Sequence, residues 1–349
     1  MQALTFEGKE IIQCNNVADP VILNSSDAIV KITLSSICGS DLHVYHEKEK
    51  GIDKGTVMGH EFTGIVVETG KEVKKFTKGS KVVSPFTTSC GQCYYCLIGL
   101  TCRCVKGNLY GWVEKGNGLQ GAQATYIRVP MADTTLIPLS NDINEEKGLL
   151  LGDIFSTGYF CAENANISSK GVYVVLGCGP VGLMAIIAAK HLKAETVFAI
   201  DNIPSRLEKA RSFGAIPLNF SSTNVREEIL NKTNGRGADA VMEVVGSDPA
   251  LKLAMDLLRP GGIISSVGVH TQEKFPFSPI EAYNKNLIYK SGRCPAHHYA
   301  EKLLKEEVVQ QYPIENIITH RFDLNEGVKA YEVFDKKLDD CIKAILLTE

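Results

Sequence analysis

The stretch VYVVLGCGPVGLMAIIAAKHL, residues 172–192, contains the pattern that decides the fold. Residues 172–177 form a continuous apolar run typical of a buried strand, and residues 180–192 are typical of an apolar helix. The turn between them has the spacing G-x-G-x-x-G, which between a strand and a helix predicts a cradle for a dinucleotide pyrophosphate. The helix N-terminus adds N–H groups and the positive end of a dipole. A glycine-rich turn that binds no ligand is the alternative.

Each glycine of this motif has an expected task. Gly177 permits the tight turn, Gly179 removes the side chain that would block the pyrophosphate, and Gly182 lets the helix pack closely on the strand. Pro180 and Val181 complete the motif, and we assign them to the same cofactor site.

The residue that ends the next expected strand indicates which nucleotide is bound. Asp201 follows Gly182 by 19 residues, and a carboxylate there can accept both adenosine ribose hydroxyls and repel a 2′-phosphate. This favours NAD over NADP. Arg206 complicates the interpretation, because a nearby arginine can pair with a 2′-phosphate. With Asp201 present, we interpret Arg206 as a ribose or phosphate contact of NAD.

Outward from the glycine motif, strands and helices alternate. Strands are predicted at residues 196–201, 239–245 and 263–268, and helices at residues 203–214 and 249–262. Strands separated by helices of this length indicate a parallel sheet with right-handed crossovers.

The regions on either side of this alternating segment show a different pattern of expected secondary structure. Short strand-like segments with Gly or Pro punctuation predict a barrel-like β domain with long loops; they lie at residues 28–37, 64–69, 80–86 and 124–130. Near the C-terminus, helices are predicted at residues 300–311 and 326–337, and a strand at 341–347. We expect this last part to rejoin the first domain. The expected domains are residues 1–155, 156–291 and 292–349, the third being a return to the first.

A lobe at residues 88–106 contains five cysteines, four of which we assign to one metal site: Cys90, Cys93, Cys96 and Cys104. Two C-x-x-C steps followed by a further thiol suit a closed tetrahedral Zn²⁺ site, which would be structural because no coordination position stays open. We prefer Cys104 over Cys102 as the fourth ligand. A redox pair or disulfides are the alternative, although such redox motifs occur near a βαβ pattern and this one does not.

The bulk properties exclude several classes of protein. The chain has 349 residues, 44% hydrophobic and 22% charged, with a net charge of −3, which gives no sign of a nucleic-acid or membrane partner. No apolar run is long enough for a membrane span, and MQALTFEGKEII lacks the features of a secretory signal. Eleven cysteines are too few for a disulfide scaffold, so we expect a cytoplasmic protein with metal-bound and unmodified thiols.

Two further clusters, CGSDLH at residues 38–43 and GHE at residues 59–61, become informative in combination. Cys38 ends an expected strand and His60 lies in a glycine-flanked loop, so both could bind one ion together with a third ligand.

Along the chain the four motifs are CGSDLH, GHE, the cysteine lobe and the glycine turn, in that order. With these motifs in that order, the chain resembles the zinc-dependent alcohol dehydrogenases of the medium-chain dehydrogenase/reductase superfamily over nearly its full length. Residues 120–140 and 291–303 resemble the branch that contains glutathione-independent formaldehyde dehydrogenases and related alcohol dehydrogenases, and the chain as a whole is most similar to the formaldehyde dehydrogenase-like and threonine dehydrogenase-like branch. The resemblance implies an α/β fold: a GroES-like β-barrel catalytic domain and a Rossmann domain with a doubly wound parallel sheet.

The resemblance also implies a catalytic zinc site. It assigns Cys38 and His60 as ligands, and Asp153 as the third, where many members have Cys. Asp41 resembles the partner that orients the liganding histidine. Glu61 resembles a glutamate that can visit the metal during ligand exchange, and a buried carboxylate beside the site is the alternative reading.

Further roles are implied by the same resemblance. Ser40 and His43 match a proton relay, whereas His46 lies off the pattern and is expected at the surface. Thr157 matches a residue that packs on the nicotinamide. Cofactor contacts are also expected at Val245, Gly268, Val269 and Arg293.

The expected function is reversible oxidation of a small alcohol to an aldehyde or ketone, with two zinc ions per chain and hydride transfer to NAD. The alternatives are a polyol, butanediol or threonine dehydrogenase, a zinc-free reductase of the same superfamily and a non-catalytic NAD-binding protein. The resemblance suggests a homo-oligomer, with a tetramer favoured over a dimer.

Overall fold

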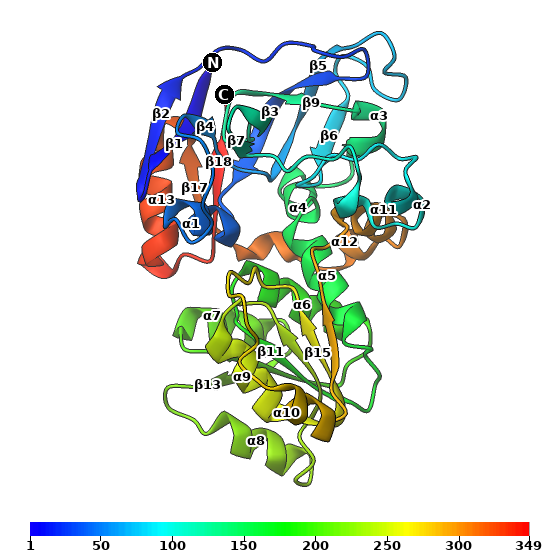
Figure 1. The fold of residues 1–349 in the computed structure, drawn as a ribbon, viewed down its shortest axis with the longest axis vertical. Coiled ribbons are helices and arrows are strands. Elements are labelled where there is room, and N and C mark those ends of the chain that lie inside the picture. The colour runs from blue at the N-terminus through cyan, green and yellow to red at the C-terminus, as the bar shows by residue number, and fades with distance from the viewer. Residues whose placement is uncertain (349) are drawn as a thin grey trace. The chain divides into compact units, whose positions relative to one another are not determined.

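The computed structural model describes residues 1–348, which divide into two compact units (Figure 1). Unit 1 contains residues 1–156 and the C-terminal residues from Pro295 onward, and unit 2 contains Thr157–Cys294. The chain therefore passes from unit 1 into unit 2 and returns.

Unit 2 is built on a parallel sheet with the strand order β13-β12-β11-β14-β15-β16. In chain order this is 3-2-1-4-5-6, the doubly wound order of dinucleotide-binding sheets. The expected Rossmann architecture is therefore confirmed. The strands are β11 (Val172–Leu176), β12 (Thr196–Asp201), β13 (Ile216–Asn219), β14 (Ala238–Glu243), β15 (Leu258–Ser266) and β16 (Ile288–Ser291). The helices are α5 (Ile154–Asn164), α6 (Pro180–His191), α7 (Pro204–Ser212), α8 (Val225–Lys232), α9 (Asp248–Leu257) and α10 (Pro279–Asn284).

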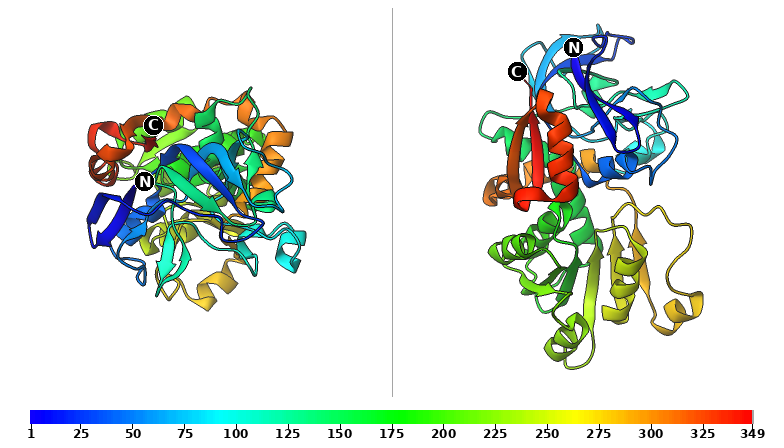
Figure 2. Two further views of the ribbon diagram at one scale, coloured as in Figure 1. Left: turned by 90° about the horizontal axis from the view of Figure 1, so that it is seen from above. Right: turned by 90° about the vertical axis from the view of Figure 1, so that its left-hand side faces the viewer.

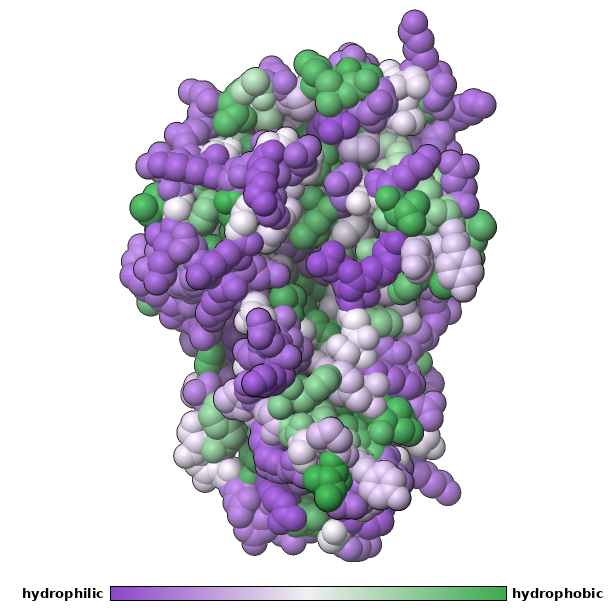
Figure 3. Space-filling model, viewed as in Figure 1, coloured by the Kyte–Doolittle hydropathy of each residue, from purple (hydrophilic) through white to green (hydrophobic). Residues whose placement is uncertain are grey.

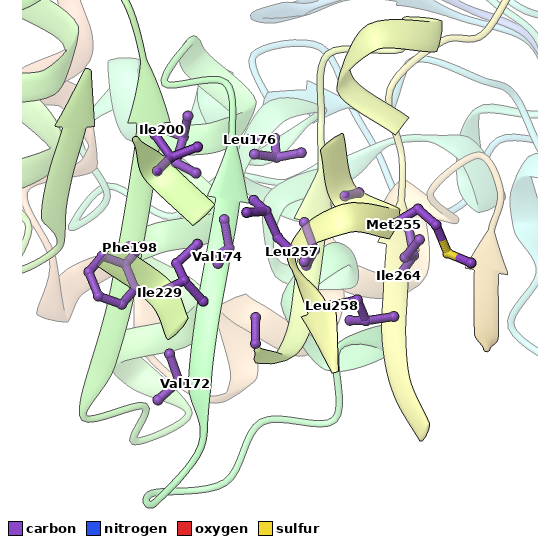
Figure 4. Packing of buried hydrophobic residues seen from close by; sticks show 14 of the residues in the cluster. Val172, Val174, Leu176, Phe198, Ile200, Ile229, Met255, Leu257, Leu258 and Ile264 are labelled. Atoms are coloured by element: carbon purple, nitrogen blue, oxygen red, sulfur yellow. The ribbon is translucent and has the colours of Figure 1, made fainter. Parts of the chain in front are cut away.

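Strand β11 lies in the middle of this sheet, and all five of its residues are buried. A parallel strand covered by helices on both faces needs apolar residues at every position, which explains the unbroken apolar run. Figure 4 shows Val172, Val174 and Leu176 beside Phe198 and Ile200 of β12, within one hydrophobic cluster. Each such side chain contributes about 1.5–3 kcal/mol by its burial.

The helix expected at residues 249–262 is shorter than predicted. It ends at Leu257, and Leu258 already pairs with Ala238 as the start of β15. Pro260 cannot donate a helical hydrogen bond, and Gly261 has a φ of +70°. The register is irregular between Ala238 and Ala240, so the Pro-Gly segment forms a bulge in the strand.

Unit 1 contains a larger sheet in the order β10-β6-β5-β3-β18-β17, with β9 also paired to β3. The first part supplies β3 (Ala28–Ser36), β5 (Phe62–Thr69), β6 (Lys81–Ser84), β9 (Tyr126–Val129) and β10 (Ile137–Pro138). The C-terminal part supplies β17 (Ile318–Asp323) and β18 (Lys343–Leu347). Strand β18 runs antiparallel to β3, with Ile345 opposite Ser36. The C-terminus thus completes the sheet that begins near the N-terminus.

Smaller elements surround this sheet (Figure 2). β1 (Gln2–Gly8), β2 (Ile11–Asn16) and β4 (Thr56–Val57) form a second sheet, and β7 (Trp112–Glu114) and β8 (Asn117–Leu119) form a hairpin. The helices are α1 (Gly39–Tyr45), α2 (Tyr94–Leu97), α3 (Ala132–Thr135), α4 (Glu145–Leu151), α11 (Ala296–Lys305), α12 (Val308–Gln311) and α13 (Gly327–Lys336). Short 3₁₀ turns lie at Thr101–Arg103, Ile314–Ile317, Leu324–Glu326 and Leu338–Asp340.

The helix predicted at residues 300–311 is two helices. α11 begins earlier, at Ala296, and ends at Lys305, and Glu307 adopts a left-handed φ of +55° before α12. A left-handed residue interrupts the helical hydrogen-bond pattern, which explains the break.

No helix among residues 1–348 combines the length and apolarity needed to cross a bilayer. Hydrophilic side chains cover much of the face seen in Figure 3, with small hydrophobic areas between them.

Candidate metal centres and cofactor site

The structure brings Cys38, His60 and Asp153 together in unit 1. Cys38 follows β3 and caps the N-terminus of α1, His60 precedes β5, and Asp153 lies between α4 and α5. Nε2 of His60 lies 3.3 Å from Oδ2 of Asp153, and Sγ of Cys38 lies 3.6 Å from the same oxygen.

These distances fit a tetrahedral zinc site. Bonds of about 2.0–2.3 Å to a tetrahedral ion place neighbouring ligand atoms roughly 3.3–3.8 Å apart. A thiolate, an imidazole and a carboxylate are all zinc ligands, and three protein ligands leave a fourth position for substrate. The donor set and its spacing therefore fit the ion that the sequence predicted.

Gly59 explains how His60 reaches this position. Its φ of +86° lies in the left-handed region, and a Cβ at residue 59 would lie 2.4 Å from Cγ of Gln123. Only glycine permits both the turn and the close approach of the buried Gln123 side chain.

Asp41 holds the His60 ring. Oδ1 of Asp41 lies 3.2 Å from Nδ1 of His60, while Oδ2 accepts the backbone N–H of Cys38 (2.9 Å) and an amide N–H of Gln123 (3.2 Å). When Nδ1–H donates to Asp41, the lone pair of Nε2 points to the proposed metal position. Tyr331 of α13 donates its hydroxyl to Oε1 of Gln123 (2.8 Å), which extends the support to the C-terminal part. Sequence patterns did not indicate Gln123 or Tyr331.

Charge around His60 and Cys38 favours a cation. Burial lowers the pKa of His60, but the Asp41 and Asp153 carboxylates outweigh it and raise the pKa well above its usual value. Burial, and then the Asp153 carboxylate, raise the pKa of the Cys38 thiol. The raised pKa of His60 shows that the neighbouring carboxylates stabilise positive charge in this site.

Glu61 lies in the same group, with a carboxylate oxygen within 4.8 Å of the other ligand atoms. Its Oε2 accepts the hydroxyl of Ser36 (2.7 Å), and its Oε1 accepts Nζ of Lys343 (2.7 Å). Lys343 also donates to the carbonyl of Ile37 (3.0 Å). In this structure Glu61 is a buried, ion-paired carboxylate beside the metal ligands.

The cysteine lobe forms a second group. Cys90, Cys93, Cys96 and Cys104 converge with their sulfur atoms within 4.8 Å of one another, and Cys102 is not part of the group. Sγ of Cys93 and Sγ of Cys96 are 3.6 Å apart, close to the spacing of two thiolates on one tetrahedral ion. Backbone N–H groups of Cys96 and then Val105 lower the pKa of Cys93 to about 6, which favours a thiolate. The residues fit a closed zinc site.

The relay candidates lie in α1, Ser40 in its first turn and His43 in its last turn. Oγ of Ser40 is 3.5 Å from Nε2 of His60. Nδ1 of His43 is buried, and no group in residues 1–348 forms a hydrogen bond with it. Burial, and then the nearby charges of Lys48 and His46, lower the pKa of His43. His46 was expected at the surface; its side chain is 25% exposed and lies between Asp335 (2.7 Å from Nε2) and Glu10 (3.1 Å from Nδ1).

In unit 2 the glycine turn has the geometry that the motif predicts. Gly177 has a φ of +91°, and a Cβ at residue 182 would lie 1.8 Å from the carbonyl oxygen of Gly177. Gly179 is the N-cap of α6, with Pro180 as the first helical residue and Val181 next. The turn therefore presents the start of α6 to a ligand, as an anion-binding cradle does.

Asp201 supports this turn directly. Its Oδ2 accepts the backbone N–H of Cys178 (2.8 Å), and its Oδ1 accepts those of Asn202 (2.7 Å) and Ile203 (3.0 Å). Nη1 of Arg206 lies 3.6 Å from where a Cβ of Gly179 would be, and its Nε is buried without a hydrogen-bond partner in residues 1–348. The carboxylate thus also stabilises the glycine loop, a task that the motif does not reveal.

The remaining cofactor candidates lie at the carboxyl ends of neighbouring strands or near the limits of unit 2. Val245 follows β14, and its Cγ2 lies 2.7 Å from a Cβ built on Gly177. Gly268 and Val269 follow β15. Thr157 is buried in α5, and Arg293 follows β16.

A doubly wound sheet with a phosphate turn, together with two clusters suited to zinc, defines a metal- and dinucleotide-dependent oxidoreductase. Comparison with protein families agrees: residues 24–140 match the alcohol dehydrogenase GroES-like domain, and residues 180–306 match the zinc-binding dehydrogenase domain. The chain belongs to the zinc-dependent medium-chain alcohol dehydrogenases.

Individual relatives are similar over most of their length. Zinc-type alcohol dehydrogenase B of Aspergillus flavus is 44% identical over 344 residues, covering 96% of this chain and 79% of that protein. The uncharacterized zinc-type alcohol dehydrogenase-like protein AdhB of Bacillus subtilis is 33% identical over 378 residues, covering 99% and 100%. The solved structure of alcohol dehydrogenase TADH from Thermus sp. ATN1 has a TM-score of 0.93 and 38% identity, with both chains covered completely.

Proposed function

We propose that this protein catalyses the reversible oxidation of a small alcohol to an aldehyde or ketone, with NAD as the hydride acceptor and two zinc ions per chain. The observation that supports it best is the convergence of Cys38, His60 and Asp153, three zinc-ligand types from separate parts of the chain. When bound, a zinc ion in such an open site supplies Lewis acidity, and the nicotinamide accepts the hydride.

The chain's own groups have distinct tasks in this proposal. Cys38, His60 and Asp153 hold the catalytic ion, and Asp41 fixes the His60 tautomer through Nδ1. Ser40, beside Nε2 of His60, takes the proton of the substrate hydroxyl, and His43 carries it outward. A lowered pKa keeps His43 neutral near pH 7, so its imidazole can accept that proton.

The metal assignment is tested by Asp153→Ala. We expect the variant to fold, to lose one of two zinc ions per chain and to lose alcohol oxidation, whereas Asp142→Ala, at an exposed site, keeps both. Metal content is measured by atomic emission and folding by circular dichroism. Full turnover or unchanged zinc content in Asp153→Ala would contradict the proposed third ligand. Zinc-free wild-type protein with reductase activity would instead favour the zinc-free alternative.

The preference for NAD rests on Asp201 and Arg206. Asp201 brings a buried negative charge to the end of β12, which disfavours a 2′-phosphate. The Arg206 guanidinium lies beside Gly179, where the motif predicts the pyrophosphate, which supports a phosphate contact. Initial rates with a panel of primary and secondary alcohols, diols and threonine, each with NAD and NADP, test cofactor and substrate together. A lower KM for NADP than for NAD would contradict the cofactor assignment.

Assembly and location complete the proposal. Family resemblance favours a homotetramer over a dimer, and light scattering on the purified protein distinguishes the two. A thiolate zinc lobe must be loaded where thiols stay reduced, which favours the cytoplasm. Imaging of the tagged protein tests this location.

A further inference from the structure

A compact polar cluster lies at the carboxyl ends of β14 and β15. Within residues 1–348, its side chains form no hydrogen bond with the glycine turn that is described above. The cluster consists of Glu243, Ser266 and His270, and Glu243 and Ser266 are fully buried. The Ser266 hydroxyl donates to Oε2 of Glu243 (2.8 Å), and Nε2 of His270 lies 3.1 Å from the same oxygen and 2.9 Å from Oγ of Ser266.

The protons of this cluster can be assigned. Ser266 has a single hydroxyl proton, which is donated to Glu243, so both atoms that face Nε2 of His270 act as acceptors. Nε2 must therefore carry a proton, in either the neutral or the charged ring. Burial opposes ionisation of Glu243, but its bonds to His270, Gly246, Ser266 and Val245 lower its pKa, and the bond to Glu243 raises the pKa of His270.

The Glu243 carboxylate also fixes backbone. Its Oε1 accepts the N–H groups of Val245 and Gly246, both at 2.8 Å. The backbone carbonyl of Glu243 accepts the N–H of Val267 (3.0 Å) and approaches that of Gly268 (3.4 Å). One residue thus holds the loop after its own strand and the loop after the neighbouring strand.

The two loops are in close backbone contact. A Cβ at residue 268 would lie 2.2 Å from the backbone nitrogen of Gly246, and a Cβ at residue 246 would lie 2.4 Å from the carbonyl oxygen of Val269. Both positions must therefore be glycine, and a shift of one loop displaces the other. The loops formed by residues 244–246 and 267–270 act as one unit.

This loop pair exposes apolar side chains near the phosphate turn. Val245 is 46% exposed and Val269 is 40% exposed, whereas the polar cluster below them is buried. Val245 also lies against Gly177. In open α/β sheets, ligands bind outside the carboxyl ends of the strands, so this surface suits the ring of a nucleotide whose pyrophosphate lies at the glycine turn.

We propose that Glu243, Ser266 and His270 are positioning residues that hold these two loops in place for the nicotinamide half of the cofactor. The inference rests on the proposed function, and none of the three side chains needs to touch the cofactor. The proposal assigns the two halves of the nucleotide to different groups of residues. Asp201 and the glycine turn serve the adenosine diphosphate half, and the Glu243 cluster serves the nicotinamide half.

The test compares two ligands on the full-length protein. NADH carries both halves, and ADP-ribose lacks the nicotinamide. His270→Ala should weaken NADH binding about tenfold, which corresponds to about 1.4 kcal/mol, and leave ADP-ribose binding nearly unchanged. His270→Gln keeps an N–H donor and should restore most of the NADH affinity. Ser266→Ala should act in the same direction as His270→Ala. NADH binding is followed by fluorescence, and ADP-ribose binding by calorimetry.

His320→Ala, which removes a histidine that stacks on Phe322 in unit 1, is the matched control and should bind both ligands as wild type does. The inference is wrong if His270→Ala binds NADH normally, if it loses both ligands equally, or if His270→Gln gives no rescue. Wild-type protein that binds neither NADH nor ADP-ribose would overturn the proposed cofactor, and this inference with it.

Discussion

Nζ of Lys343 lies 2.7 Å from Oε1 of Glu61, and neither side chain exposes any surface. The two residues are 282 positions apart, one in the last strand and one beside His60, a proposed metal ligand. Burial alone would lower the pKa of the Lys343 ammonium, but the Glu61 carboxylate outweighs it and the pKa is raised. The C-terminal strand therefore neutralises a carboxylate that would otherwise lie without a charged partner beside the proposed metal ligands.

Removing Lys343 should destabilise the protein strongly. Lys343→Met leaves Glu61 buried without its partner, a change that typically costs about 3–5 kcal/mol. The double variant Lys343→Met/Glu61→Gln should recover much of this loss in the free energy of unfolding, measured by urea denaturation. Lys336→Met, at an exposed pair with Glu332, is the control and should leave stability unchanged. Equal stabilities of Lys343→Met and wild type would show that the pair contributes nothing.

Two glycines of the phosphate turn should respond differently to alanine. At residue 179 a Cβ would meet only Nη1 of Arg206 at 3.6 Å, so Gly179→Ala should keep its melting temperature. It should nevertheless lose affinity for NADH and ADP-ribose, because the methyl group occupies the space expected for the pyrophosphate. Gly182→Ala should lower the melting temperature itself, since its Cβ would overlap the carbonyl of Gly177. Normal ADP-ribose binding by Gly179→Ala would place the phosphates elsewhere.

His46 should make stability depend on pH. Its bond to Asp335, against a smaller effect of burial, raises its pKa in the folded state. The stabilisation is therefore fully present below the unfolded-state pKa of about 6.5 and is lost as the pH rises through the folded-state pKa. His46→Gln should lower the melting temperature more at pH 6 than at pH 9. A difference independent of pH would mean that the charge on His46 does not contribute.

Cys93→Ser should reduce the zinc content and stability of the cysteine lobe and leave the turnover rate nearly unchanged. Replacing one of four thiolates with the weaker serine ligand should release the structural zinc and lower the melting temperature. The kcat of the correctly assembled protein should stay near that of the wild type. Zinc content should fall from two ions per chain to one. Cys102→Ser, outside the ligand group, should keep both ions. Loss of kcat in a stable, assembled Cys93→Ser protein would contradict a structural role.

Local patterns in the sequence predicted the architecture well. The strand, glycine turn and helix at residues 172–192 are adjacent in the chain, and their tasks depend on backbone geometry that neighbouring residues set. The C-x-x-C steps are equally local, because their thiols lie within one short loop that can surround a tetrahedral ion. Two predicted helices were too long. The apolar pattern of residues 249–262 continues past the end of α9 at Leu257, ahead of Pro260, and residues 300–311 are interrupted by the left-handed Glu307.

The supporting groups around the sites were not predictable in this way. Gln123 and Tyr331 are separated by 208 positions, and their hydrogen bond has no sequence signature. Glu61 has two open interpretations in the sequence, and its ion pair with Lys343, 282 positions away, has no sequence signature. His46 had no visible partner in the sequence, because Glu10 and Asp335 come from opposite ends of the chain.

The amino-acid sequence by itself determined the class of protein, the phosphate turn and the types of zinc ligand, because these depend on short-range spacing and on the chemistry of individual side chains. Only the tertiary structure decided which charges neutralise one another and which backbone each buried carboxylate holds. The charge pairs join residues far apart in the chain, 282 positions in the case of Glu61 and Lys343. The energies of both kinds of contact arise from burial in a low dielectric, which exists only after the chain has folded.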